Sequence, residues 1–232
     1  MKTKLGLRFL CCALSGALLN APAAPSSLSS EVSTPSASVS TNWRSVAAGT
    51  SLFVAIGRDG NIYTSNGDSK WTARESRIPF GLRSVAYGQG LFVAVGDEGA
   101  LVTSSDGVVW TEQAARTGER LRGVAFGNGT FIAVGYDGTI RSSKNGGRWK
   151  IQNSGTHNRL QSVVFAGDKF VVVGWNGTII TSAKGTQWTL CQPGVSTRLE
   201  AIALSHGQLM VASAGRVALS SRDGLTWNAY QP

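Results

Sequence analysis

The chain has 232 residues, of which 42% are hydrophobic and 15% charged, and it contains 29 glycines. Its 22 basic and 13 acidic residues give a formal charge of +9 at pH 7, which favours acidic partners or surfaces without choosing among them. A transmembrane helix needs ~20 consecutive apolar residues, and no stretch of the sequence approaches that length.

Residues 1–23 have the three parts of a secretory signal peptide. Lys2, Lys4 and Arg8 precede an apolar run from Phe9 to Leu19, and small alanines follow as signal peptidase requires. Arg8 and Phe9 stand where a lipoprotein signal has small and aliphatic residues, so we reject lipid attachment at Cys11 or Cys12. The sequence therefore predicts an exported protein, periplasmic or secreted.

Residues 24–42 form a serine-rich segment that is nearly free of large apolar side chains. Such a segment cannot bury enough surface to offset its ordering entropy, which predicts a flexible tail. Cleavage of the leader removes three basic residues and leaves 19 basic against 13 acidic ones, a charge of +6. Because Cys191 is then the one remaining cysteine, the mature chain depends on its core and not on disulfides.

An internal repeat of 39 residues occupies residues 43–232. Tryptophan recurs at this interval, and so does the large apolar residue that begins each copy: Trp71, Trp110, Trp149, Trp188 and Trp227; Trp43, Leu82, Leu121, Leu160 and Leu199. Five copies without insertion or deletion indicate an array of one supersecondary unit.

Each repeat contains four short β-rich runs joined by glycine-containing turns. In the second copy these runs are Arg83–Tyr87, Leu91–Val95, Leu101–Ser104 and Val108–Gln113. Four strands joined by hairpins form an antiparallel meander, and a unit of this length is typical of a propeller blade. The predicted fold class is therefore all-β, a β-propeller of five four-stranded blades.

The turn before each repeated tryptophan has a recognisable motif. Residues 104–110 (SSDGVVW) and 221–227 (SRDGLTW) resemble Asp-box repeats, also called BNR repeats, which occur in sialidases, sortilin-type receptors and the photosystem II assembly factor family. The segments VAVGDEGALVTSSDG and IAVGYDGTIRSSKNGG are most similar to the assembly-factor-like branch, and the similarity covers residues 43–232. This resemblance implies that the aspartate and serine brace the turn and that the tryptophan packs between blades.

The motif is incomplete in three of the five copies. Asp106 and Asp223 match it, whereas Gly67, Asn145 and Lys184 stand at the same position elsewhere. This loss favours a structural motif over a metal or catalytic site.

Closure of the ring is left open by the sequence. The first copy begins with its own first strand, and the last ends with its own fourth strand, predicted over Thr226–Gln231, so no latch is obvious unless residues 30–36 supply one. Blade-face contacts alone, or pairing of open edges between chains, are both compatible with this pattern.

Arginine has a periodic distribution. It ends three inter-blade loops, and it or another polar residue recurs near the start of the innermost strand: Arg120, Arg159 and Arg198; Arg44, Arg83, Arg122, Gln161 and Glu200. Repeat symmetry places these residues around one mouth of the central channel, which predicts a basic ring for a carboxylate, phosphate or sulfate group. The alternative is that the arginines cap strands, pair with acids such as Glu119 or keep the surface soluble.

The neighbouring turn position varies most between copies: Arg58, Asp97, Tyr136, Trp175 and Ala214. Tyr136 and Trp175 are the aromatic anchors that we expect in a protein or glycan interface. The preferred interpretation is an exported, non-enzymatic scaffold that binds an acidic protein segment or an anionic polysaccharide, without cofactor, metal or nucleic acid. The resemblance further suggests a helper in assembling an envelope or membrane complex.

Two alternatives remain, a glycan-binding lectin and a sialidase-like exo-glycosidase. Arg77, Ile78 and Pro79 form the Arg-Ile-Pro tripeptide of sialidases, but they follow the first box-like turn instead of preceding it. No glutamate is placed to activate a tyrosine nucleophile, and His157 and His206 lie at unrelated positions of the repeat. The sequence therefore predicts no catalytic residues.

Overall fold

The computed structural model describes residues 43–68, 70–76, 79–113, 118–213 and 216–230. The predicted leader and serine-rich tail lie outside the described residues, and so do Arg77, Ile78 and Ala214.

Twenty strands form five four-stranded antiparallel sheets, which confirms the predicted fold class. We call the sheets blades 1 to 5. Their strands are β1 (Trp43–Ala48), β2 (Phe53–Gly57), β3 (Ile62–Ser65) and β4 (Thr72–Arg74); β5 (Leu82–Gly88), β6 (Leu91–Gly96), β7 (Leu101–Ser104) and β8 (Thr111–Glu112); β9 (Leu121–Gly127), β10 (Thr130–Gly135), β11 (Ile140–Ser143) and β12 (Lys150–Gln152); β13 (Leu160–Ala166), β14 (Lys169–Gly174), β15 (Ile179–Ser182) and β16 (Thr189–Cys191); β17 (Ala201–Ser205), β18 (Gln208–Ser213), β19 (Arg216–Ser221) and β20 (Asn228–Ala229). A single 3-10 turn, η1 (Asp97–Gly99), joins β6 to β7.

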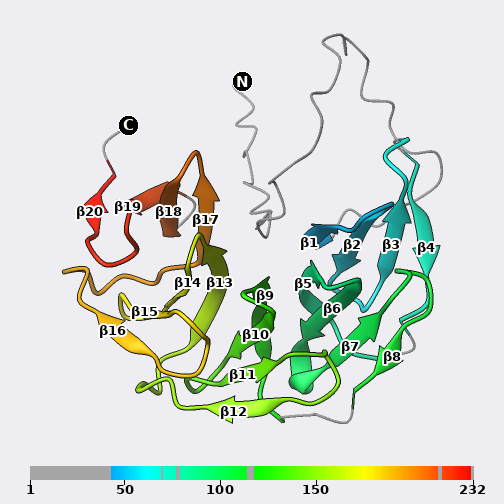
Figure 1. Ribbon diagram of the computed structural model, residues 1–232, viewed down its shortest axis with the longest axis horizontal. Coiled ribbons are helices and arrows are strands. Elements are labelled where there is room, and N and C mark those ends of the chain that lie inside the picture. The colour runs from blue at the N-terminus through cyan, green and yellow to red at the C-terminus, as the bar shows by residue number, and fades with distance from the viewer. Residues whose placement is uncertain (1–42, 69, 77–78, 114–117, 214–215, 231–232) are drawn as a thin grey trace, which may run out of the picture.

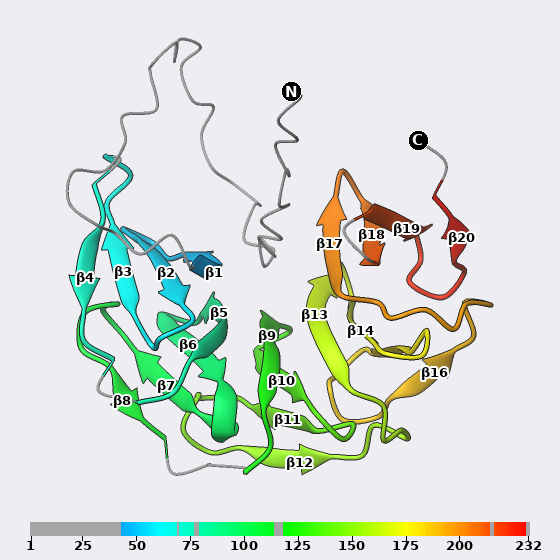
Figure 2. The ribbon, with the colours of Figure 1, turned by 180° about the vertical axis from the view of Figure 1, so that it is seen from behind.

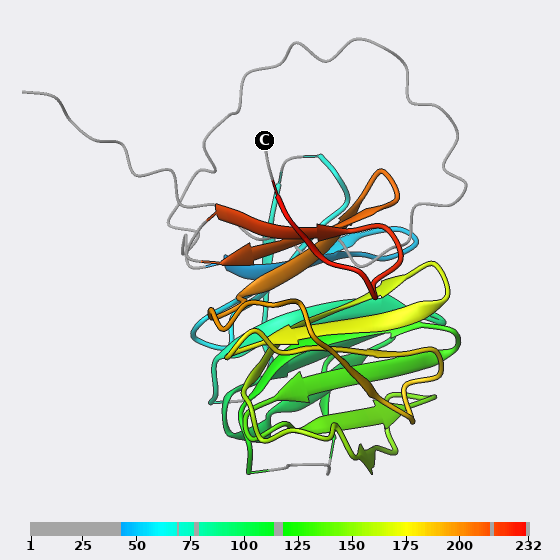
Figure 3. The ribbon, with the colours of Figure 1, turned by 90° about the vertical axis from the view of Figure 1, so that its left-hand side faces the viewer.

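The blades follow one another along an arc around a common centre. The first strand of each blade is innermost, and β1, β5, β9, β13 and β17 contact one another in that order. Seen from the side, neighbouring sheets lie face against face as layers (Figure 3). Blade 1 and blade 5 form the two ends of the arc and stand apart in both face-on views (Figures 1 and 2). Each blade consists of four consecutive strands, so within the described residues no strand acts as a latch.

Packing between blades supplies the core. The second strand of blade 3 contains Phe131, Ile132, Ala133 and Val134, and none of these side chains is more than 1% exposed, because one sheet face meets blade 2 and the other meets blade 4. Four apolar clusters fill the four junctions between successive blades. At ~25 cal/mol per Å2 of buried apolar surface, this burial outweighs any exposed ion pair.

The turn between the third and fourth strands is held by one carboxylate. Asp106 Oδ1 accepts hydrogen bonds from the Val108 and Val109 amides at 2.8 and 2.9 Å and from Ser104 Oγ at 2.9 Å. The indole of Trp110 donates to the Gly107 carbonyl at 3.0 Å, and its ring joins the cluster between blades 1 and 2. The prediction of a fourth strand over Val108–Gln113 was therefore too long, since the first of these amides bind the carboxylate, and β8 comprises only Thr111–Glu112.

Candidate ligand-binding site at the channel mouth

A β-bulge lies at the start of the innermost strand in blades 1 to 4. In blade 1, Trp43 pairs with Gly57 and Ser45 with Ile56, so Arg44 is the extra residue between two successive pairs. The same irregularity leaves Arg83, Arg122 and Gln161 as the extra residues of the next three blades. A bulge changes the direction of a side chain relative to the regular pleat. The repeat thus presents one polar side chain per blade to the centre.

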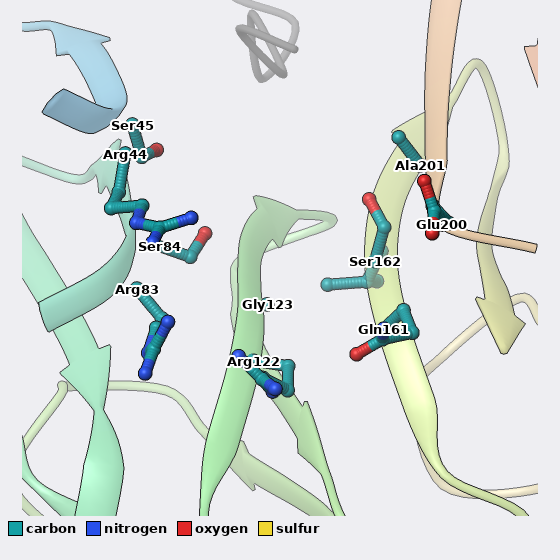
Figure 4. A pocket seen from close by; sticks show the side chains of 11 residues that line it. Arg44, Ser45, Arg83, Ser84, Arg122, Gly123, Gln161, Ser162, Glu200 and Ala201 are labelled. Carbon is teal, nitrogen blue, oxygen red and sulfur yellow. The ribbon is translucent and has the colours of Figure 1, made fainter. Parts of the chain in front are cut away.

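These side chains line a cavity of about 140 Å3. Arg44, Arg83 and Arg122 come from blades 1 to 3, while Gln161 and Glu200 come from blades 4 and 5 on the other side of the opening (Figure 4). Ser45, Ser84 and Ser162 follow the bulge residues and also line the cavity. The structure therefore brings together the residues predicted near the start of the innermost strand, with the positive charge concentrated on one half of the mouth. Arg120, Arg159 and Arg198, predicted around the same mouth, are not among the residues that line this cavity.

Two of the three arginines are held in place by neighbouring turns. Arg83 forms an ion pair with Asp97, with Nη2 2.6 Å from Oδ2 and a second hydrogen bond from Nε, and both side chains are at most 20% exposed. Arg122 donates from Nη2 to the Tyr136 hydroxyl at 2.8 Å, and its guanidinium lies 5.1 Å from the centre of that ring. These contacts orient the guanidinium groups, and they leave Arg44 and Arg122 without a carboxylate in an ion pair among the described contacts.

The positively charged arginines at the mouth lie close enough together to repel one another. Burial, followed by the charges of Arg58 and Arg83, lowers the pKa of Arg44. Burial also lowers the pKa of Arg122, with Arg83 and Arg120 adding repulsion. A guanidinium stays protonated at neutral pH in spite of such shifts. The arginines at the mouth therefore repel one another while remaining charged.

A ladder of alternating arginine and aromatic side chains continues from the mouth across blades 3 to 5. Arg159 lies between two rings, 3.9 Å from the centre of Tyr136 and 4.7 Å from that of Trp175. Arg120 lies 6.0 Å from Tyr136 on one side, and Arg198 lies 5.0 Å from Trp175 on the other. The order is therefore Arg120, Tyr136, Arg159, Trp175, Arg198.

Backbone hydrogen bonds connect the inter-blade loops, which carry the arginines of this arginine–aromatic ladder, to the turns that carry its aromatic residues. The amide of Tyr136 donates to the Arg120 carbonyl at 3.0 Å, and that of Trp175 donates to the Arg159 carbonyl at 2.9 Å. The inter-blade loops and the turns between second and third strands hence share one face of the arc. Sequence reasoning treated the arginines and the aromatics as separate columns and missed their stacking. A constant offset of 16 residues from Arg120 to Tyr136 and from Arg159 to Trp175 was the available signal.

Several donors in this region are not used within the described part of the chain. The Nε atoms of Arg122 and Arg159 and the indole nitrogen of Trp175 are buried and make no hydrogen bond there. Arg120 and Arg198 have carboxylate neighbours, Glu98 at 3.6 Å and Glu200 at 3.2 Å. The periphery of the site is thus partly neutralised, whereas its centre keeps free donor capacity for water or a ligand.

The serines of the mouth have a second role that the sequence analysis did not find. Ser45 Oγ accepts from the Val85 amide of the next blade at 3.2 Å, and Ser84 and Ser162 make the equivalent bonds to Val124 and Ile202. Their spacing of 39 residues and multiples of it was the available signal. These bonds tie the wall of the cavity across blade junctions.

Other potential reactive groups do not converge. His157 contacts Asp137 at 3.0 Å and His206 contacts Ser205 at 3.0 Å, in different blades and on exposed turns. Burial raises the pKa of the Cys191 thiol, which disfavours the nucleophilic thiolate. Across the described ranges, no three His, Cys, Asp or Glu side chains gather in a way that could hold a metal ion. The same ranges contain no helix with the length and apolar content to span a membrane.

Five repeated meanders packed face to face, with polar side chains directed to the inner opening, define a β-propeller repeat protein. The match to a known family makes this specific. The chain belongs to the family described as the DUF6242 beta propeller domain, which it matches over residues 28–159, more than half of its length. A search of curated proteins found no match.

Solved structures share the fold at low sequence identity. YCF48 bound to D1 peptide is 18% identical with a TM-score of 0.60, over 81% of this chain and 66% of that one. YCF48 from Cyanidioschyzon merolae is 18% identical with a TM-score of 0.56, over 74% and 64%. The WD40 beta propeller domain of Doa1 is 18% identical with a TM-score of 0.56, over 78% and 69%. The chain thus spans about two thirds of the length of these structures.

Proposed function

We propose that this chain is a non-enzymatic scaffold whose channel mouth binds an acidic segment of another protein. The observation that carries the proposal is the convergence of Arg44, Arg83 and Arg122 on one cavity through a repeated β-bulge. Guanidinium groups bind carboxylates through paired, charge-assisted hydrogen bonds. Two of the three have no carboxylate partner in an ion pair among the described contacts, so an incoming acidic group would supply one.

The shape of the site favours a peptide over a glycan. A cavity of about 140 Å3 is smaller than the ~300–1,000 Å3 typical of small-molecule pockets, which suits one acidic side chain or a chain terminus at a time. A lectin presents open aromatic faces to sugar rings, whereas Tyr136 and Trp175 are stacked against arginines. YCF48, which shares this fold, has been solved with a D1 peptide, and this supports peptide binding here.

The wider setting is also part of the proposal. The leader-like residues 1–23 support export, and the Asp-box-like turns support a relationship to assembly-factor propellers. We infer a role as a helper that holds an acidic protein segment during assembly of an envelope or membrane complex. The separate placement of the two histidines and the protonated Cys191 thiol support a role without catalysis.

Binding to a defined probe tests this proposal. We would titrate a fluorescein-labelled hexaglutamate peptide with the parent protein and with the double variant R44Q/R122Q and follow fluorescence anisotropy. Since a hydrogen bond to a charged group contributes about 1.5–3 kcal/mol, the double variant should bind roughly tenfold more weakly or worse. Binding should also weaken as NaCl rises from about 50 to about 500 mM, because salt screens the attraction.

A charge-matched control separates the site from general basicity. Lys144 and Lys184 line a basic surface on the Asp-box side, away from the mouth, and K144Q/K184Q removes the same two charges. It should retain parental affinity. Equal weakening in both double variants would contradict the proposal, and tighter binding of a sulfated dextran than of hexaglutamate would favour the polysaccharide alternative.

A further inference from the structure

The two ends of the arc expose sheet faces that every other blade buries. We define the leading face as the side of blade 1 turned away from blade 2; there Phe53 is exposed, Trp43 and Trp71 are half-buried, and Tyr63 is 8% exposed. The trailing face is the side of blade 5 turned away from blade 4, with Ala203, Ser205, Met210 and Ala212. Phe53 is 42% exposed, whereas its equivalents Phe92, Phe131 and Phe170 are at most 2% exposed. Within the described residues, blades 1 and 5 each have one sheet face without the neighbouring blade found at all four internal junctions.

The leading face is aromatic. The rings of Trp43 and Trp71 lie 4.6 Å apart in an edge-to-face arrangement, and Tyr63 lies 6.1 Å from Trp43. The other four blades have a leucine in place of Trp43, and they have Val102, Arg141, Ile180 and Leu219 in place of Tyr63. At these two positions the leading face hence carries larger side chains than the faces equivalent to it.

The trailing face carries a correspondingly smaller side chain at the end of its second strand. At each internal junction, one branched residue at the end of the second strand shares a buried cluster with the leucine that begins the next blade; the pairs are Ile56 and Leu82, Val95 and Leu121, Val134 and Leu160, Val173 and Leu199. All eight side chains are fully buried. At the two end faces the corresponding residues are Ala212 and Trp43. A smaller residue on one face is thus matched by a larger residue on the other.

A second position shows the same compensation. Gly88 and Gly127 lie against aromatic rings of the following blade, where a Cβ atom would come within 2.1 Å of Phe126 and 2.0 Å of Phe165. On the trailing face Ser205 stands in place of the glycine, and its side chain would clash with an aromatic ring packed at this position. On the leading face the aromatic is replaced by Ala48. The two end faces are therefore complementary to each other at two independent positions.

We infer that the leading face of one copy of this chain packs on the trailing face of a second copy. The contact would extend the internal blade-to-blade junction across two chains, with Trp43 and Phe53 covered by the second copy's blade 5. Closure within a single chain would require all four internal junctions to tilt together; these are close-packed, and three of them are also tied by serine hydrogen bonds. The separation of blades 1 and 5 makes a second copy the better occupant (Figures 1 and 2).

Such a contact is head to tail, because it joins two different surfaces. It leaves one leading and one trailing face free in each dimer, unless the copies close into a ring. Association must therefore survive when one chain lacks a functional leading face and the other lacks a functional trailing face.

Two blocking variants test the inference. F53E places a charge on the leading face, and S205W places a bulky ring on the exposed trailing position. Sedimentation velocity of the full chain, from about 1 to about 100 µM, should show mass-action association for the parent. Each variant alone should sediment as a monomer, and an equimolar mixture of the two should form a one-to-one dimer.

The controls keep the test decisive. I151E changes an apolar side chain that is 75% exposed on the outer strand of blade 3, and it should leave association unchanged. Thermal melts should show that the variants stay folded. If S205W does not stay folded, M210E serves as a second trailing-face variant. A parent that remains a monomer throughout the range, or a mixture that does not associate, would overturn the inference.

Discussion

At the scale of single residues, one side-chain oxygen in the turn before the tryptophan accepts hydrogen bonds from backbone amides that would otherwise belong to the fourth strand. Asp106 and Asp223 each accept two backbone amides and one serine hydroxyl through Oδ1. In blade 3 the amide oxygen of Asn145 binds the Gly147 and Arg148 amides at 3.2 and 3.1 Å. In blade 3 a neutral acceptor thus takes the place of the charged carboxylate.

Two substitutions of Asp106 should therefore give different results. D106A removes the acceptor from three donors and should lower Tm by roughly 2–4 °C, the shift expected for about 1 kcal/mol in a chain of this size. D106N keeps the acceptor, as Asn145 does, and should lose less than half as much. Differential scanning calorimetry would measure both, and equal losses would show that charge, not acceptance, holds the turn.

The pH dependence of the same turns supplies an independent measurement. Hydrogen bonds from the Val109 and Val108 amides lower the pKa of Asp106, and those from Thr226 and Leu225 lower the pKa of Asp223. A carboxyl whose pKa is lower in the folded state stabilises the fold above its unfolded pKa of ~3.9, and this contribution is lost as the pH falls toward the folded value. D106N/D223N should therefore lose less Tm than the parent between pH 7 and pH 3.

At the scale of elements, the junction between blades depends on glycines at the end of the first strand. G127A would place a methyl group within 2.0 Å of the Phe165 ring, an overpacking that costs about 1–3 kcal/mol. The blade 4 to blade 5 junction has Ala166 and Leu204 at these positions. F165L in the G127A background should therefore recover part of the lost stability, although it removes an aromatic contact of its own.

Urea unfolding of the four proteins in this cycle measures the coupling. The two substitutions should be less destabilising together than the sum of their separate effects, by more than the ~0.5 kcal/mol expected for independent sites. Strictly additive losses would show that the blades can move apart by enough to absorb the methyl group.

At the scale of elements, the sequence predicted the number of blades but not all strand lengths or side-chain contacts. The 39-residue period located all five blades, because turn glycines and apolar runs recur without a break. It overestimated the fourth strand, since Val108 and Val109 have strand-like side chains whose amides are taken by Asp106. The stacking of Arg159 between Tyr136 and Trp175 was not predicted, because the constant 16-residue offset indicates a repeated relation between loop and turn but does not show that their side chains touch.

At the scale of the whole molecule, the curvature of the arc was not predictable from the repeat. Each junction sets a small rotation between sheets, and this rotation depends on side-chain packing that repeat length does not encode. Here the four junctions leave blades 1 and 5 apart at the two ends of the arc (Figures 1 and 2). The result is an open channel mouth with arginines on one half and two apolar end faces.

An open array of blades should not be uniformly stable. Each blade in a quasi-linear array is stabilised by its own sheet and by its contacts with nearest neighbours, and the end blades have only one neighbour. Hydrogen exchange should therefore be slowest in β9, β10, β13 and β14 and faster in β2 and β18, measured by mass spectrometry at low micromolar concentration. If the end faces pair between copies, protection of β2 and β18 should rise with protein concentration while that of β10 stays constant. Uniform protection at all concentrations would indicate that the two ends are already covered, and the arc would then be closed within one chain.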